Sequence, residues 1–93
     1  MKKPVDELSK VVTIVNELGL HARSAAKISA LAKKASAFIW LTREGEDADA
    51  TSIIDVLSLA CPKGSEIRIT IENPVDLETL KALVNLIESG FGE

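Results

Sequence analysis

The spacing of apolar residues changes abruptly in the last third of the chain. Glu66–Ile71 alternates isoleucine with polar residues, which is the period of a strand with one buried face. Asn73 and Pro74 follow as an N-cap residue and a proline at the first helical position. The apolar residues after them recur at helical spacing (Leu80, Leu83, Val84 and Ile87), and Gly90 stops the pattern. This region therefore predicts a half-buried strand followed by an amphipathic helix.

The earlier part of the chain shows the same change of period. In chain order we expect a strand over 10–16, a helix over 22–34, a strand over 36–42, a short edge strand over 47–51, and a short helix that Ser52 caps and that ends before Pro62 and Gly64. A glycine within 43–46 marks the hairpin between the second and third strands. The order strand, helix, strand, strand, helix, strand, helix predicts an α+β fold, an open-faced two-layer sandwich with its helices on one face of the sheet.

Composition narrows the classes of function. The chain has 93 residues, 46% of them hydrophobic and 27% charged, which suits one small domain, with 1–9 expected as a flexible N-terminal extension. A formal charge of -3 and a single tryptophan argue against a nucleic-acid surface. The segment after Pro4 lacks the apolar run of a signal peptide, and Cys61 has no second cysteine to pair with. We therefore expect a monomeric cytoplasmic protein with no disulfide, metal site, cofactor or membrane insertion.

The only histidine, His21, lies between the first expected strand and the first expected helix, within the run Gly-Leu-His-Ala-Arg over 19–23. A helix N-terminus offers an anion unpaired backbone N–H groups and the positive end of the helix dipole. Neutral imidazole is a good nucleophile, and a phosphorylated ring nitrogen is a good leaving group. The run therefore fits a phosphoryl carrier, with positive charge supplied by Arg23. The alternatives are that His21 only caps the helix and that Arg23 is a solvated charge.

Two stretches of the chain resemble segments of one known protein family. Gly-Leu-His-Ala-Arg-Ser-Ala over 19–25 is similar to the phosphohistidine signature Gly-Leu-His-Ala-Arg-Pro-Ala of the histidine-containing phosphocarrier (HPr) family of the phosphoenolpyruvate-dependent sugar phosphotransferase system, and 50–64 is similar to its regulatory serine segment. The resemblance implies four antiparallel strands with three helices on one face. It also implies that enzyme I phosphorylates His21 on Nδ1, that Arg23 stabilises the phosphate, and that a sugar-specific permease component, enzyme IIA, receives the group.

The resemblance further implies a docking surface for enzyme I and enzyme IIA near the histidine. Six residues are expected to contact these partners: Ala22, Ser24, Lys27, Ile53, Ile54 and Leu57. Because the last three cannot all face the core of so short a helix, we expect some of them to be exposed. The alternatives are core positions for Ile53 and Leu57, with only Ile54 exposed, and an ordinary solvated charge for Lys27.

Two residues depart from the family pattern. Ser24 stands where the family has proline, and we expect it to loosen the start of the helix. Ser52 matches the regulatory serine, which implies an HPr serine kinase/phosphorylase as a further partner. Asp55, one helical turn on, disfavours an added phosphate, so a plain N-cap at Ser52 is the alternative.

Three other functions stay open. Ser24 and Asp55 are compatible with a regulatory paralogue that serves a nitrogen-related or signalling branch of the phosphotransferase system. A non-catalytic binding module would use His21 only as a helix cap. A stand-alone hydrolase is disfavoured because the histidine has no evident oriented acid or base partner nearby. We expect a carrier that is the substrate and product of other enzymes and catalyses nothing alone.

Overall fold

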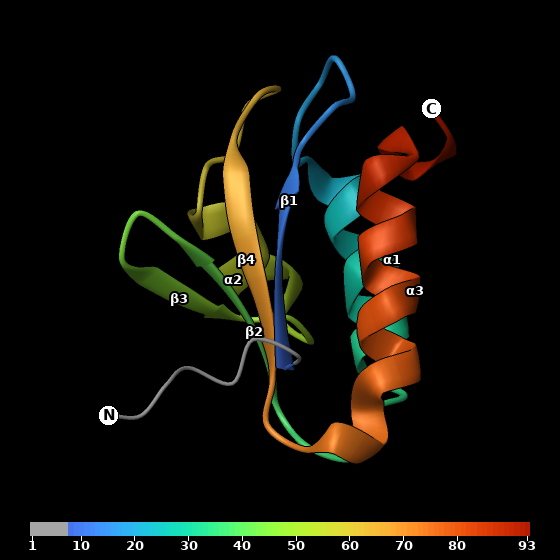
Figure 1. Cartoon of the computed structure of the whole chain (residues 1–93). Coiled ribbons are helices and arrows are strands. Elements are labelled where there is room, and N and C mark those ends of the chain that lie inside the picture. Colours follow the sequence, from blue (N-terminus) through green and yellow to red (C-terminus); the bar gives the residue numbers. More distant parts are fainter. Residues whose placement is uncertain (1–7) are drawn as a thin grey trace.

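The computed structural model describes residues 8–93 and contains one four-stranded sheet. Its strands are β1 (Ser9–Thr13), β2 (Ile39–Arg43), β3 (Glu46–Asp49) and β4 (Glu66–Ile71). Their order across the sheet is β1-β4-β2-β3, and all three neighbouring pairs are antiparallel. The helices α1 (Ala22–Ala32), α2 (Ile53–Ser58) and α3 (Leu77–Glu88) lie on one face of this sheet (Figure 1). The expected open-faced α+β sandwich is confirmed, and β3 is an edge strand as expected.

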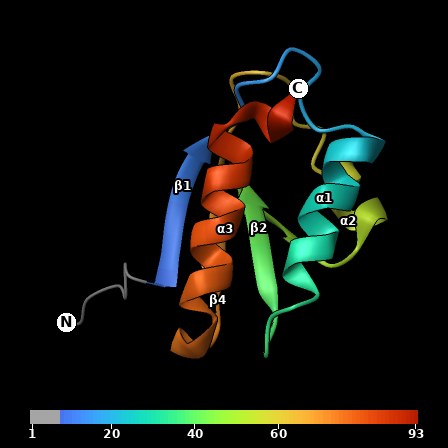
Figure 2. The ribbon, with the colours of Figure 1, turned by 90° about the vertical axis from the view of Figure 1, so that its right-hand side faces the viewer.

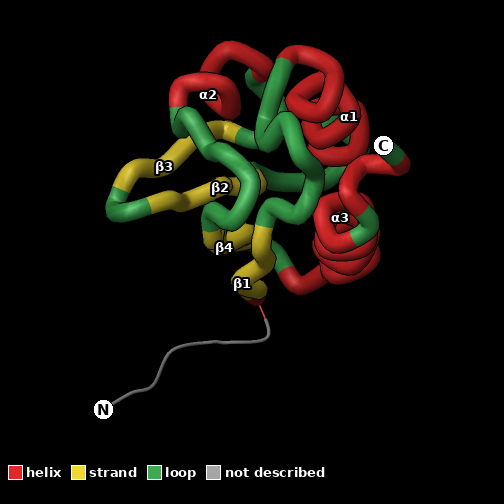
Figure 3. Tube along the Cα trace, turned by 90° about the horizontal axis from the view of Figure 1, so that it is seen from above, coloured by secondary structure: helices red, strands yellow, loops and turns green. Residues whose placement is uncertain are grey.

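The helical layer is ordered α3, α1, α2 across the sheet. α3 packs against β1 and β4, while α1 packs between α3 and α2, and α2 reaches β3 (Figures 2 and 3). The alternation in β4 points the isoleucines at 67, 69 and 71 into this layer, where each is at most 2% exposed. Val12 and Ile14 face the same way, whereas Val11, Thr13 and Val15 face out. The alternation of apolar residues in the sequence therefore predicts correctly which face of the sheet is buried.

The first strand differs from the expected 10–16 at both ends. β1 begins at Ser9, and Leu8 packs against the core, so the last two residues of the expected extension belong to the described fold. Residues 1–7, the rest of that extension, lie outside the described part of the chain. β1 ends at Thr13 because Ile14 exchanges hydrogen bonds with a loop: Gly64 N–H donates to its carbonyl (2.7 Å) and its N–H donates to the Ser65 carbonyl (2.8 Å).

The connection from α1 to β2 also differs from expectation. α1 ends at Ala32 and β2 begins at Ile39, although 22–34 and 36–42 were the predicted spans. The backbone N–H groups of Ser36 and Ala37 donate to the buried carboxylate of Asp76, at 2.8 and 3.1 Å. Because these donors are already used, the two residues do not enter the strand ladder.

Local turn chemistry sets the remaining element boundaries. β3 ends at Asp49, short of the expected 51, because the Asp49 side chain accepts the backbone N–H and hydroxyl of Thr51. The pair Asn73-Pro74 opens a 3₁₀ turn, η2 (Pro74–Asp76), that leads into α3, and the Asn73 side chain accepts Val75 N–H as the expected cap. Gly90 ends α3 and begins a second 3₁₀ turn, η3 (Gly90–Gly92), which the sequence did not predict.

Candidate functional site

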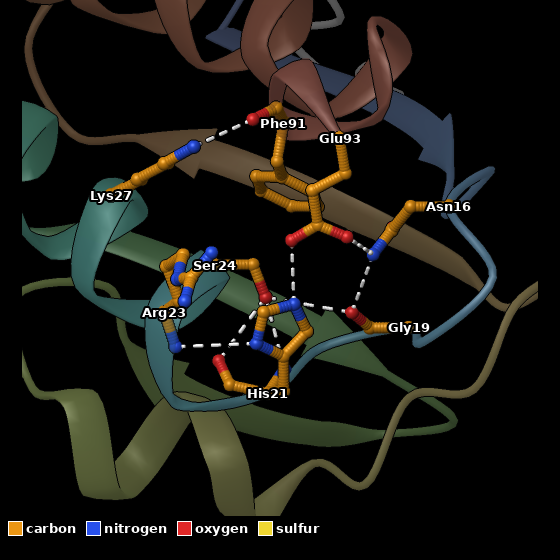
Figure 4. A network of polar contacts seen from close by, with 8 residues as sticks. All are labelled: Asn16, Gly19, His21, Arg23, Ser24, Lys27, Phe91 and Glu93. Carbon is orange, nitrogen blue, oxygen red and sulfur yellow. Dashed lines mark hydrogen bonds and ion pairs between the residues drawn. The ribbon is translucent and has the colours of Figure 1, made fainter.

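The imidazole of His21 is held at the first turn of α1. His21 is the N-cap residue, with extended backbone (φ −136°, ψ −179°), and its Nδ1 accepts the backbone N–H of Arg23 at 3.3 Å. In return, Ser24 Oγ accepts the backbone N–H of His21 at 2.9 Å (Figure 4). These reciprocal bonds form a capping box, so the helix start fixes both the backbone and the ring of His21.

The approach to His21 requires glycine at position 19. Gly19 has φ of +66°, and a Cβ there would lie 2.8 Å from Cα of Pro62 and closer still to the carbonyl oxygen of Cys61. That carbonyl accepts the backbone N–H of Leu20 at 2.8 Å. The loop before α1 therefore packs its backbone directly on the segment between α2 and β4.

A carboxylate partner of the histidine comes from the far end of the sequence. Glu93 Oε2 lies 2.6 Å from His21 Nε2, and the two side chains are 24% and 27% exposed. Its other oxygen, Oε1, accepts Asn16 Nδ2 at 3.0 Å, and the same nitrogen donates to the Gly19 carbonyl at 2.9 Å (Figure 4). The expectation that His21 lacks an oriented acid or base partner is therefore wrong. The sequence did not reveal this partner because Glu93 lies 72 positions away from His21 in the chain.

Opposing effects set the charge of the Glu93 carboxyl. Partial desolvation raises its pKa, while hydrogen bonds from Asn16 and His21 and the electrostatic attraction of the His21 ring and of Lys27 lower it. The lowering effects prevail, so the pKa lies below the ordinary value for glutamate. Glu93 therefore faces the imidazole as a carboxylate at neutral pH. In the tautomer that satisfies both ring contacts, Nε2 carries the proton and Nδ1 the lone pair.

The turn η3 delivers Glu93 to this position. Phe91, at φ of +61°, is 1% exposed and anchors the turn in the core. Its carbonyl accepts Lys27 Nζ at 2.7 Å (Figure 4). Lys27, expected to contact partners, therefore has its ammonium group on the protein's own backbone. The sequence shows Gly-Phe-Gly-Glu without indicating where this turn packs.

Positive charge beside the imidazole comes from Arg23. Among residues 8–93 its guanidinium forms no hydrogen bond or ion pair, and the residue is exposed. It lines an open hollow of about 650 Å³ together with Leu18, His21, Ala22 and Glu93. The hollow thus combines an imidazole nitrogen, a helix N-terminus and an arginine, which suit a phosphoryl group. The Glu93 carboxylate in the same hollow contacts Nε2, the other ring nitrogen.

Comparison with known proteins agrees with this arrangement. The family model described as "PTS HPr component phosphorylation site" matches residues 8–89. The chain belongs to the HPr family. It is 40% identical to the phosphocarrier protein HPr of Cupriavidus necator over 86 residues, which cover 92% of this chain and 97% of that protein. It is also 38% identical over 87 residues to the phosphocarrier protein NPr of Escherichia coli K12, with the same coverage.

Solved HPr structures share the fold. HPr-C-His from Thermoanaerobacter tengcongensis superposes with a TM-score of 0.86 at 39% identity, covering 91% of this chain and 96% of that one. A solved HPr dimer from the same organism superposes with a TM-score of 0.73 at 38% identity and covers all of both chains. The HPr family consists of phosphocarrier proteins of the phosphotransferase system, so the chain is a phosphocarrier and not a catalytic enzyme.

The departure from the HPr signature at Ser24 has a structural role that differs from our expectation. The residue is fully buried, and its hydroxyl accepts the His21 N–H and approaches the His21 carbonyl at 3.1 Å. Serine therefore ties the helix start to the histidine instead of loosening it. Ser24, expected to contact partners, has a side chain that the protein itself covers.

The other expected docking residues divide by exposure. Ile54 is 76% exposed and Ile53 39%, so neither is a core residue, whereas Leu57 is half-buried. Ala22 is exposed, and Leu18, which sequence reasoning missed, is 72% exposed. Leu18 and Ala22 border the hollow at His21, and α2 packs beside α1. Exposed apolar side chains thus occur at the hollow and on α2, the helix that packs beside α1.

Ser52 caps α2 as the sequence predicts. Its Oγ accepts the backbone N–H of Asp55 at 3.2 Å, and the residue is half-buried. The Asp55 carboxylate stands in the first turn of the same helix.

Two further observations concern other kinds of site. Across the described residues 8–93, no three His, Cys, Asp or Glu side chains gather in a group suited to a metal ion, and no helix is long and apolar enough to cross a membrane. Cys61 is a buried free thiol, and burial raises the pKa of its sulfur.

Proposed function

We propose that His21 accepts a phosphoryl group on Nδ1 from phosphorylated enzyme I and passes it to a histidine of a sugar-specific enzyme IIA. One observation supports this most directly: Nδ1 of a partly exposed imidazole faces the N-terminus of α1, 3.3 Å from the backbone nitrogen of Arg23. Membership of the HPr family supports the phosphocarrier class. The identities of donor and acceptor are part of the proposal.

The proposed step exchanges one set of contacts for another. The Nδ1 lone pair forms the N–P bond while the bond between phosphorus and its donor breaks, and the proton stays on Nε2. The phosphoryl oxygens replace Nδ1 as acceptors of the Arg23 N–H and meet its guanidinium and the positive end of the helix. Only a few donors hold the group, and the hollow is open, so the next acceptor can reach it.

We propose that both partners dock on the exposed apolar side chains at the hollow and on α2. We infer that Ala22, Ile53, Ile54 and Leu57 contact enzyme I and enzyme IIA, together with Leu18. Supporting this, three of these side chains are large, apolar and well exposed within the described fold: Leu18, Ile53 and Ile54. A small carrier that meets two proteins in turn can use one such surface for both.

The experiment is incubation with phosphoenolpyruvate and a catalytic amount of cognate enzyme I, followed by intact-mass measurement before and after acid treatment. The parent should gain one acid-labile phosphoryl group, and His21→Ala should gain none while remaining folded. The capping contact of His21 also fits a binding module without phosphotransfer. That alternative prevails if an active cognate enzyme I leaves the parent unmodified and His21→Ala keeps every partner interaction.

A second candidate is a regulatory paralogue of a nitrogen-related or signalling branch. The observation in its favour is that identity to an NPr, 38%, is nearly as high as identity to an HPr, 40%. The phosphorylated protein should be offered sugar-branch and nitrogen-branch enzyme IIA domains in parallel. Faster transfer to the first supports sugar transport, and faster transfer to the second supports the paralogue.

Ser52 is proposed as a site for an HPr serine kinase/phosphorylase. Its position as N-cap favours an added phosphate through the helix dipole, and the Asp55 carboxylate opposes it. Incubation with ATP and such a kinase, beside Ser52→Ala, should give an acid-stable phosphate on the parent alone. Absence of that phosphate would leave Ser52 with its capping role.

A further inference from the structure

The carboxylate of Glu93 occupies a place that the phosphotransfer chemistry of His21 does not itself require. It hydrogen-bonds the ring nitrogen opposite the proposed nucleophile, at 2.6 Å, and comes from a separate turn after α3. Each ring nitrogen of a histidine is influenced by the bond that the other one makes, because that bond sets tautomer and orientation. A fixed acceptor at Nε2 therefore favours the proton on that nitrogen and the lone pair on Nδ1, the nitrogen that accepts the Arg23 N–H.

Glu93 is itself fixed from two directions. Behind it, Phe91 is buried and its carbonyl is held by Lys27, so the turn cannot swing away without exposing an aromatic ring. Beside it, the Asn16 amide donates to Oε1. The carboxylate is thus anchored through its backbone and through the oxygen that does not contact His21.

Asn16 contributes a donor at a cost to the fold. The residue is 7% exposed, and its Oδ1 is buried with no hydrogen-bond partner among the described residues. A buried acceptor without a partner is destabilising. The role of asparagine at this position lies in Nδ2, which donates hydrogen bonds both to the Gly19 carbonyl, two residues before His21, and to Glu93.

We propose that Glu93, held by Asn16, is a positioning residue for His21 that keeps the proton on Nε2 and the lone pair on Nδ1. The inference rests on the proposed function. As the phosphoryl group bonds to Nδ1, the ring retains its Nε2 proton and becomes cationic, and the facing carboxylate balances that charge. When the N–P bond breaks, its electron pair returns to Nδ1 and the ring is neutral again.

The first test reads the tautomer directly and needs no phosphorylation. The ring nitrogens of His21 are observed by ¹⁵N NMR in neutral imidazole, using protein without an added C-terminal tag. The parent should show the Nε2–H tautomer alone, Glu93→Ala a mixture of both tautomers, and Glu93→Gln, which keeps a neutral acceptor, the parent pattern again. Glu88→Ala changes an exposed glutamate on the last turn of α3 and serves as the matched control. A single unchanged tautomer in Glu93→Ala overturns the proposal.

The second test measures phosphoryl acceptance from enzyme I. Glu93→Ala should lower the rate about tenfold, in line with losing the orienting partner of a functional histidine, and Glu88→Ala should match the parent. Asn16→Leu should slow acceptance, and combining it with Glu93→Ala should add little, because both act on one contact. Equal rates for the parent and Glu93→Ala overturn the proposal. If the parent accepts no phosphate, the proposed function fails and the tautomer alone decides the role of Glu93.

Discussion

The N-termini of α1 and α2 are built alike and differ in charge. Each begins with a side-chain cap, His21 Nδ1 for α1 and Ser52 Oγ for α2. The first turn of α1 carries Arg23 and no acidic residue, whereas that of α2 carries Asp55. The carboxylate near α1, that of Glu93, contacts Nε2 and not the proposed nucleophile Nδ1. Backbone N–H groups and the helix dipole favour an anion at the N-terminus of each helix, so the neighbouring side chains decide where a phosphate is stabilised. On this basis α1 provides the proposed phosphorylation site, and α2 contributes exposed apolar side chains.

Reversing the charge at α1 should have the largest effect. Arg23→Glu gives α1 the acidic first turn of α2, and we expect phosphoryl acceptance by His21 to fall about 100-fold through loss of a charge-assisted contact and gain of repulsion. The free energy of unfolding should not fall, because an acidic residue suits a helix N-terminus. Acceptance is measured with enzyme I and stability by urea denaturation. Arg68→Glu, on the open face of the sheet, should accept phosphate at the parent rate. An equal loss of acceptance in Arg68→Glu would show that the effect does not depend on the position of Arg23 at α1.

Removing apolar surface from α2 should affect binding and leave the chemistry intact. Ile54→Ser should raise KM for enzyme I about fivefold, the scale of one truncated interface contact, with kcat and stability unchanged. The matched control is Val75→Ser, which changes a side chain 66% exposed in η2. Steady-state phosphotransfer kinetics measure both variants. A fall in kcat with constant KM would contradict the division of roles between the two helices.

The two serine caps should differ in their contribution to stability. Ser52→Ala removes one hydrogen bond to an exposed first turn, and we expect a loss of about 1 kcal/mol. Ser24→Ala leaves the His21 N–H without its partner at a covered position, and we expect about 2 kcal/mol. Urea denaturation of both variants at one temperature gives the comparison. A larger loss at Ser52 would show that the capping box at α1 contributes little.

Acidification should produce the smallest effect, which acts through the Glu93 carboxylate beside the start of α1. The pKa of Glu93 is lower in the folded protein than in the unfolded chain, so its stabilisation is present above the ordinary value of 4.5 and is lost as the pH falls through the folded pKa. The melting temperature of the parent should therefore drop more than that of Glu93→Gln between about pH 5 and about pH 3. Parallel thermal melts of the two proteins test this. Identical pH profiles would mean that the carboxylate contact adds nothing to folding.

Sequence periodicity predicted the elements well where local structure depends on local residues. β4 was predicted to the residue, and the caps at Ser52 and Asn73 follow from short side chains that reach their own helix starts. The displaced boundaries have distant causes: Ser36 and Ala37 bond to Asp76, and Ile14 pairs with a loop 50 residues on. A pattern of apolar spacing contains no information about such partners.

The residues of the functional site also separate into those set by the local sequence and those set by distant contacts. The motif around His21 and Arg23 is contiguous, so its helix N-terminus, nucleophile and positive charge could be predicted from the sequence alone. The buried state of Ser24, the anchoring of Lys27 on Phe91, and the contacts of Glu93 with Asn16 and His21 could not. The contacts of Lys27 and Glu93 exist because α3 packs beside α1, which brings the η3 turn over the start of α1. The local sequence determined the nucleophile, and tertiary packing decided which groups surround it. A contact between residues 72 positions apart forms only when the whole domain is folded.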